Sequence, residues 1–249
     1  MPKCILYVRF THYDKHLFNH FMKHYLNLGV YKICININYR FEEDKTDYEN
    51  FVEFVNSSEY INNLVITLGP NNDTVAEGVH CTIAKKSALA LCDLNEDFVI
   101  PADSDEFHKY PDTLENLMIM MVKNNIDYLT GHTYEKVSQD GFCKNVDSNI
   151  DIFEQFPNVN NKLFVASKIG LIKSNIADLL GVGHHYLNNK KLTCKNGVQT
   201  HHFRWTLESK KRVENWIKLW KNPLCQGWKD ISKYEKILEL YNCNLLEYK

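Results

Sequence analysis

Short apolar runs alternate with helical patterns along the first hundred residues of the chain. The runs predict buried strands at Cys4–Val8, Val30–Ile37, Leu64–Leu68 and Phe98–Ile100. Apolar residues at helical spacing predict helices at Lys15–Leu28, Phe51–Val55 and residues 78–92. Because strands that alternate with helices indicate a parallel sheet covered by helices, the predicted fold class is α/β.

The second half of the chain is less regular. A helix is predicted over Leu114–Val122, with strands at Ile126–Thr130, Leu163–Ser167 and Val198–Phe203. Residues 138–160 are rich in Asn and Asp and predict a long loop. Apolar stripes at Val213–Trp220 and Ile231–Tyr241 predict two C-terminal helices that each bury one face by packing. With no internal repeat or linker, we expect one domain.

Composition and charge exclude several classes of protein. The 249 residues are 44% hydrophobic and 12% aromatic, and 29 Lys and Arg face 31 Asp and Glu. A disordered chain would have fewer aromatic residues and a higher net charge. No stretch approaches the ~20 apolar residues of a membrane span, and a net charge of -2 argues against a general nucleic-acid binder.

The eight cysteines form no CxxC pair, and several lie inside apolar runs. This usage is typical of reduced cysteines that serve as small hydrophobic residues. The run Cys4–Val8 is also too short for the core of a signal peptide. We therefore expect a cytoplasmic protein.

Three acidic residues follow the fourth predicted strand, in the sequence Asp103-Ser104-Asp105-Glu106. In open parallel sheets, ligands bind beyond the carboxyl ends of the strands. If the backbone stays extended, Asp103 and Asp105 point the same way, roughly 6–7 Å apart at Cα. Two such carboxylates favour a divalent ion, Mn²⁺ or Mg²⁺, that could clamp a diphosphate leaving group.

The alternative interpretation of this segment is a solvated turn, and an acidic triplet alone does not decide against it. Its place after a buried strand favours the metal site. Pro101 lies just before the triplet and predicts that the strand stops before Asp103.

Two pairs of adjacent histidines stand in the second half, His184-His185 and His201-His202. Neutral imidazole is a good ligand for transition metals, so one of them could complete a metal site begun by the aspartates. A surface or hydrogen-bonded core histidine is the simpler interpretation for any single one.

The motifs FNHFMKHYLNLGV, ADSDEF, YEKVSQDG, FEQFP, GVGHH and HHFRW follow one another over most of residues 4–220. In this order they resemble the glycosyltransferases of the glycosyltransferase-A fold, in the group related to family two. The resemblance implies a Rossmann-like, mostly parallel central sheet flanked by helices. Within one domain over residues 1–249, it implies a nucleotide-binding half at about 1–107, an acceptor half at about 108–205 and C-terminal helices at about 206–249.

The resemblance also implies an activity: transfer of a sugar from a nucleotide-diphosphate sugar to a glycan or other hydroxyl acceptor, with Mn²⁺ or Mg²⁺. It assigns Asp103, Asp105 and His202 to the metal. It places Glu106, His184 and His185 at the sugar or acceptor.

The donor nucleotide is assigned by the same resemblance to the ends of the strands. Arg9, Thr11 and Asn38 would hold the base and ribose, where many relatives have Asp in place of Asn38. Asp103, Ser104 and Lys85 complete the donor-binding set, although an exposed lysine is the simpler interpretation of Lys85.

An inverting transfer needs a general base, usually a carboxylate. The candidates are Glu135, Asp140 and Glu154, and we favour Glu135, with Glu154 second, because Glu135 follows a predicted strand. The sequence leaves stereochemistry open. A nucleotidyltransferase and a non-catalytic nucleotide- or carbohydrate-binding module are the alternative functions, and the first would normally carry a glycine-rich loop that Arg9–Asp14 lacks.

Overall fold

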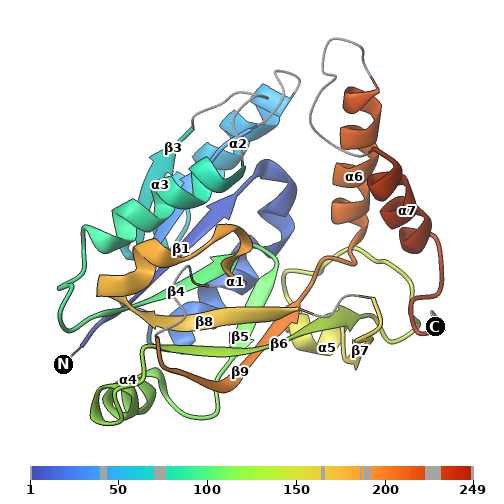
Figure 1. The fold of residues 1–249 in the computed structure, drawn as a ribbon. Helices are drawn as coiled ribbons and strands as arrows, with labels where there is room; N and C mark the ends of the chain where they lie inside the picture. The colour runs from blue at the N-terminus through green and yellow to red at the C-terminus, as the bar shows by residue number, and fades with distance from the viewer. Residues whose placement is uncertain are drawn as a thin grey trace.

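The computed structural model describes residues 2–39, 44–69, 77–163, 166–185, 187, 192–221 and 231–247 (Figure 1). Its strands form one curved sheet in the order β3-β2-β1-β4-β8-β6-β9-β5, with β7 paired to β6. In the described residues, no helix is long and apolar enough to cross a membrane.

The first half is a parallel βα unit. Its strands are β1 (Cys4–Phe10), β2 (Lys32–Ile37), β3 (Leu64–Leu68) and β4 (Phe98–Asp103). Its helices are α1 (Lys15–Asn27), α2 (Lys45–Asn56) and α3 (Glu77–Leu89). The pairs β1–β2, β2–β3 and β1–β4 are all parallel, which confirms the predicted α/β class and its Rossmann-like first half.

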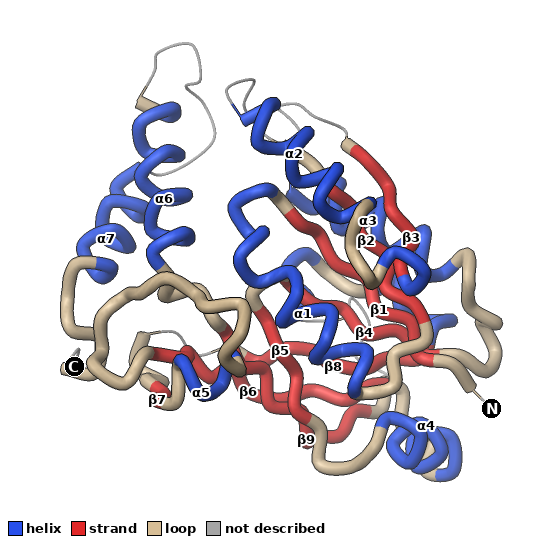
Figure 2. The backbone as a smooth tube through the Cα atoms, turned by 180° about the vertical axis from the view of Figure 1, so that it is seen from behind, coloured by secondary structure: helices blue, strands red, loops and turns tan. Residues whose placement is uncertain are grey.

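Alternation along β1 explains why helices cover both faces of this half. Leu6, Val8 and Phe10 pack in the cluster formed with α1 and α2, whereas Ile5 and Tyr7 pack against α3. The two faces are both apolar, as expected for a parallel sheet buried on both sides. Figure 2 shows α1 and α2 on the face turned toward the viewer.

The second half joins the sheet largely through antiparallel pairs. It contains β5 (Glu106–Lys109), α4 (Leu114–Lys123), β6 (Tyr128–Val137), α5 (Ile152–Gln155), β7 (Asn158–Val159), β8 (Ser167–Lys173) and β9 (Cys194–His202). β8 is antiparallel to β4 and to β6, β5 is antiparallel to β9, and β6 runs parallel to β9. The chain leaves β4 and enters β5 after a two-residue turn, so residues 103–106 connect two distant positions of the sheet.

Two C-terminal helices, α6 (Leu207–Trp220) and α7 (Ile231–Tyr241), pack against each other beside the second half (Figure 1). Val213, Ile217 and Tyr241 are buried with Trp205 and Val137 in a separate apolar cluster. The prediction that the two stripes serve packing is confirmed at these positions.

Three local predictions were wrong, and one strand was missed. β4 continues through Pro101 to Asp103, because β8 pairs with β4 at Phe98 and Val99, well before the proline, and a proline is tolerated where a strand has an open edge. Residues 138–160 hold α5 and β7, so they are not one long loop. The strand expected at Leu163–Ser167 begins only at Ser167, and β5 was not predicted at all.

Candidate functional site

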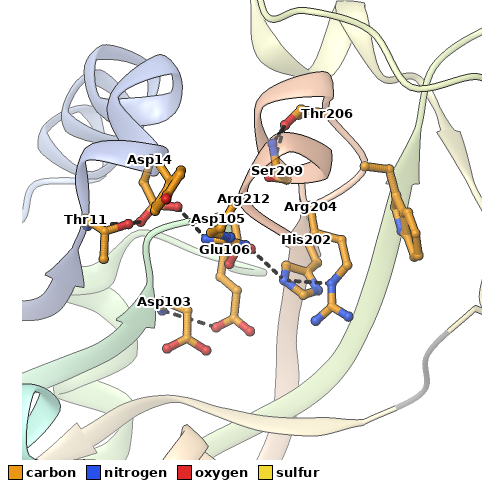
Figure 3. A network of polar contacts seen from close by, with 12 residues as sticks. Thr11, Asp14, Asp103, Asp105, Glu106, His202, Arg204, Thr206, Ser209 and Arg212 are labelled. Atoms are coloured by element: carbon orange, nitrogen blue, oxygen red, sulfur yellow. Dashed lines mark hydrogen bonds and ion pairs between the residues drawn. The ribbon is translucent and has the colours of Figure 1, made fainter. Parts of the chain in front are cut away.

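The acidic segment lies where the sequence placed it, at the carboxyl end of β4, but its geometry differs from the prediction. Ser104 and Asp105 form a turn between β4 and β5, so the backbone is not extended there. Asp103 and Asp105 consequently have different partners. Asp105 faces His202 and Arg212 (Figure 3). Asp103 instead shares Lys168 with Glu106.

The side chain of His202 lies between two carboxylates. Its Nε2 is 3.2 Å from Oδ2 of Asp105, and its Nδ1 is 2.8 Å from Oε1 of Glu135. The second oxygen of Glu135 accepts a hydrogen bond of 2.7 Å from Nε1 of Trp205. β9 supplies His202 and β6 supplies Glu135, at paired positions of the two strands. The strand register therefore sets the orientation of the imidazole.

Charge is strongly coupled along this line of contacts. Burial and Arg204 lower the pKa of His202, but Glu135 and Asp105 outweigh them and raise it to about 9. Burial alone would raise the pKa of Asp105. The positive charges of His202, Arg212 and Arg204 nevertheless hold this pKa well below its usual range. The isolated site therefore holds an imidazolium between two carboxylates.

A second cluster lies beside the first. Nζ of Lys168 donates to Oδ2 of Asp103 at 2.8 Å and lies 2.8 Å from Oε1 of Glu106. Burial would lower the pKa of Lys168, but the two carboxylates raise it, so the ammonium is retained. The side chain of Asp103 is 40% exposed, against 2% for Glu106, so Asp103 is the carboxylate of this cluster that a ligand can reach.

Arg212 of α6 connects the site to the start of the chain. Its Nη1 donates to Oδ1 of Asp14 at 2.8 Å, and its Nη2 is 3.9 Å from Oδ2 of Asp105. Asp14 in turn accepts from the hydroxyl and the backbone N–H of Thr11 in a capping box at the end of β1. Thr11, predicted to bind nucleotide, is thus tied into the same network (Figure 3).

The other residues predicted to bind the base and ribose form a group of their own. Nε of Arg9 donates to Oδ1 of Asn38 at 2.8 Å, and Nδ2 of Asn38 is 3.3 Å from Nε2 of His80. On the other side of its ring, Nδ1 of His80 lies 3.1 Å from Oδ1 of Asn36. Arg9 is paired with Asp103 in the register of β1 and β4, so this group borders the acidic segment.

Lys85 and His184 lie together on the face of β1 that packs against α3. They line a small cavity with Tyr7, and Lys85 approaches the carbonyl oxygens of Ala177 and Asp178. Lys85 is buried, contrary to the simpler interpretation of an exposed lysine. His184 stacks edge-on against Tyr7, and burial lowers its pKa to about 4.

The remaining predicted residues are spread more widely. Ser104 is buried in the turn, and His185 is exposed, with its Nδ1 at 2.8 Å from the carbonyl of Ser167. Glu154 is exposed on α5. Asp140 is exposed in a loop, where it accepts from Ser138 and from the backbone N–H of Phe142.

Glu135 differs most from its predicted role. Its side chain has no exposed surface, and both oxygens already accept hydrogen bonds. In this position it supports the imidazole of His202. Its role as general base stays a prediction.

Asp105 and His202 fit a divalent ion. Neighbouring ligand atoms of an octahedral ion with bonds of about 2.0–2.1 Å lie roughly 3 Å apart, close to the 3.2 Å between Oδ2 and Nε2. A carboxylate on the other imidazole nitrogen, here Glu135, is the usual support of a metal-binding histidine. Among the described residues, no group of three His, Cys, Asp or Glu side chains is placed to hold a metal. The remaining positions would fall to water and substrate oxygens.

Sequence reasoning missed three residues of the site: Lys168, Arg212 and Asp14. Lys168 lies at the polar start of β8, next to Ser167, so no local pattern marks it as a buried, paired cation. Arg212 and Asp14 are far apart in the sequence and carry no local signal. Arg204 and Trp205 belong to the motif HHFRW, but their contacts to Glu135 were not foreseen.

No protein-family model and no curated protein matches this chain. Among solved structures, it is similar to S. aureus TarS 1–349, with a TM-score of 0.43 and 16% identity over 96% of this chain and 70% of that one. An apo UDP-glucose pyrophosphorylase gives 0.35 and 10%, over 82% and 91% of the two chains. A UTP-bound enzyme of that name from Acinetobacter baumannii gives 0.39 and 12%, over 100% of both. All three TM-scores are below 0.5, so these similarities do not identify the function.

Proposed function

We propose that this chain is a glycosyltransferase. It transfers a sugar from a nucleotide-diphosphate sugar to a hydroxyl acceptor, with inversion and with Mn²⁺ or Mg²⁺. The observation that carries the proposal is the line Glu135–His202–Asp105 at the carboxyl end of β4. This is the edge of a parallel sheet at which ligands bind.

Asp105 and His202 would hold the ion, with Glu135 fixing the imidazole from behind. When bound, the ion would supply Lewis-acid stabilisation of the diphosphate leaving group. Because the neutral imidazole is the form that binds a metal, His202 would hold the ion through Nε2 in its neutral form.

The chain's own cations surround the same place. Arg212 lies near Asp105 and Arg204 lies near His202, and both would offer charge to phosphate oxygens as these become more negative during transfer. Lys168 fixes Asp103, whose exposed oxygen can accept a hydrogen bond from a ribose or sugar hydroxyl. Arg9, Asn38 and Thr11 lie beside them at the ends of β1 and β2 and would bind the nucleoside.

The proposal is tested by incubating the protein with a panel of nucleotide-diphosphate sugars and Mn²⁺ and measuring the nucleoside diphosphate released. Asp105→Asn should abolish release, because the amide gives up the charge that holds the ion, while the melting temperature of the metal-free variant shows that the fold persists. Glu115→Gln, an exposed change on α4, is the matched control. Unchanged turnover in Asp105→Asn would refute the role of Asp105.

Two further measurements separate the alternative functions. Release of pyrophosphate from a nucleoside triphosphate and a sugar 1-phosphate would identify a nucleotidyltransferase. Tight binding of nucleotide sugars without any turnover would identify a binding module. The anomeric configuration of the product, read by NMR, tests inversion.

A further inference from the structure

A groove of about 760 Å³ lies next to the site and takes no part in the function proposed so far. Its floor is the 3-10 helix η1 (His12–Asp14) with the first turn of α1, and its walls are α2 and α6. In Figures 1 and 2, α2 and α6 lie opposite each other at the same end of the molecule. The volume lies within the ~300–1,000 Å³ of small-ligand sites.

The lining of this groove carries charges of both signs in equal number. Three lysines face three carboxylates, namely Lys15, Lys211 and Lys218 against Asp44, Asp47 and Glu208. Burial lowers the pKa of His12 and of His16, so both line the groove as neutral imidazoles. A balanced lining has no net attraction for a phosphate or another anion. It suits a neutral ligand that is rich in hydrogen-bonding groups.

Two residues of the lining, His12 and Glu208, each hold a buried polar atom. Nδ1 of His12 and Oε2 of Glu208 have no hydrogen-bond partner among the described residues, but neither is open to the groove. The groups that a ligand in the groove can reach are the lysine, carboxylate and asparagine side chains of the lining, which form hydrogen bonds with hydroxyl groups. Tyr13, whose ring lies against His12, adds an aromatic surface for the apolar face of a sugar ring.

The groove is joined to the proposed metal pair by one side chain. Arg212 lies on α6 between the groove residues Lys211 and Asn215, and it contacts both Asp14 and Asp105. η1 likewise carries His12 and Tyr13 into the groove and Asp14 toward Arg212. Arg212 and Asp14 therefore link the elements that line the groove to Asp105. The nucleoside residues Arg9 and Asn38 do not line it.

We infer that this groove binds the acceptor of the proposed transfer, and that the acceptor is a neutral carbohydrate. The inference rests on the proposed function, because it names the second substrate of that reaction. The groove selects uncharged polyhydroxyl compounds by its balanced charges and by the aromatic ring of Tyr13.

The test blocks the groove without touching the metal pair. Asn50 lines the groove from α2, and its neighbour Glu49 does not, although both are exposed. Asn50→Trp should fill the groove, and Glu49→Trp places the same side chain on the same helix outside it. Binding of methyl β-D-glucopyranoside, methyl β-D-galactopyranoside and methyl 2-acetamido-2-deoxy-β-D-glucopyranoside is measured by saturation-transfer NMR. UDP and Mn²⁺ are present in excess to fill the donor site.

We expect a glycoside signal in the wild type and in Glu49→Trp, and a loss of at least several-fold in Asn50→Trp. UDP affinity and melting temperature should be the same in all three proteins. Undiminished glycoside binding in Asn50→Trp overturns the inference. So does loss of UDP binding in a folded Asn50→Trp, since the groove would then hold the nucleotide.

Two further outcomes separate this inference from the proposed function. If UDP binds but none of the three glycosides does, the groove is not a neutral acceptor site and the inference fails, while the proposed function stands. The wild type is also tested with the nucleoside diphosphates of all five common bases. If it binds none of them, the proposed function fails and the inference fails with it.

Discussion

His202 is fixed by contacts that come from three strands or turns of the sheet. Glu135 on β6 faces its Nδ1, Asp105 in the turn after β4 faces its Nε2, and β9 carries the ring itself. If the buried carboxylate of Glu135 bonded only to His202, its second oxygen would be unsatisfied. Nε1 of Trp205 donates a hydrogen bond to that oxygen. Because every polar atom on this side is engaged, the imidazole has one orientation, with Nε2 toward Asp105.

This arrangement predicts the effect of Glu135→Gln on metal binding. The amide keeps the size of the side chain but removes the negative charge that supports the imidazole. We expect Mn²⁺ affinity to fall by about 10–100-fold, as it does when other carboxylates behind metal-binding histidines are replaced. Isothermal titration calorimetry measures it, with Glu115→Gln as the control. Unchanged affinity in Glu135→Gln would mean that Glu135 does not orient a metal ligand.

At this scale the sequence located the chemistry but not its geometry. Asp105 and His202 were predicted together because both belong to recognisable motifs. The parallel orientation of Asp103 and Asp105 was wrong, since a turn at Ser104 separates their partners. Lys168 could not be placed from the sequence, because its contact to Asp103 depends on how β8 joins β4.

Elements of strong period were predicted well, and elements defined by their neighbours were not. α1 has apolar residues at helical spacing, and β1 and β3 are short apolar runs of strand length. β5 is short and lies in a polar segment, and it is a strand only because β9 pairs with it. β4 continues through Pro101 for a similar reason, since the ladder with β1 continues to Asp103.

The packing of α1 against β5 predicts a dependence of stability on pH. Nε2 of His24 lies 2.9 Å from the carbonyl of His108, and burial lowers the pKa of His24 from 6.5 to about 4. The folded state thus holds the neutral ring, and the unfolded state takes up the proton more readily. This contribution to stability is complete above pH 6.5 and is lost as the pH falls toward 4.

His24→Gln keeps an N–H donor for that carbonyl but cannot titrate. Between pH 6.5 and 4 the wild type should therefore lose up to about 3 kcal/mol more unfolding free energy than the variant, at ~1.4 kcal/mol for each unit of pKa. Urea denaturation at several pH values measures both proteins. Parallel pH profiles would show that His24 is not buried in its neutral form.

Over the whole molecule, Arg212 joins the C-terminal helices to the first half. Its contact with Asp14 is largely shielded from water, with side-chain exposures of 17% and 4%. The sequence predicted α6 and the packing of its apolar stripe, but not this contact, because a charged residue on a helix is usually solvated. The groove between α2 and α6 could not be predicted from the sequence either, because most of the residues that line it are charged or polar residues of helices.

Arg212→Ala should loosen α6 from the body of the protein. Removing one partner of a buried ion pair leaves Asp14 uncompensated and should cost about 3 kcal/mol. Hydrogen exchange should speed up in α6, α7 and η1 and stay unchanged in β1 and β2. Lys210→Ala removes a contact to Asn242 that is open to solvent, and should change little. Equal effects of the two substitutions would contradict the structural role of Arg212.

The partners of Asp105 lie about a hundred residues further along the chain. During synthesis on a ribosome, the turn after β4 emerges long before His202 and Arg212 are added. Its carboxylate then has neither imidazole nor guanidinium beside it, and long-range contacts of this kind form late and slowly. The nascent polypeptide can therefore complete the contacts of Asp105 only after α6 has been synthesised.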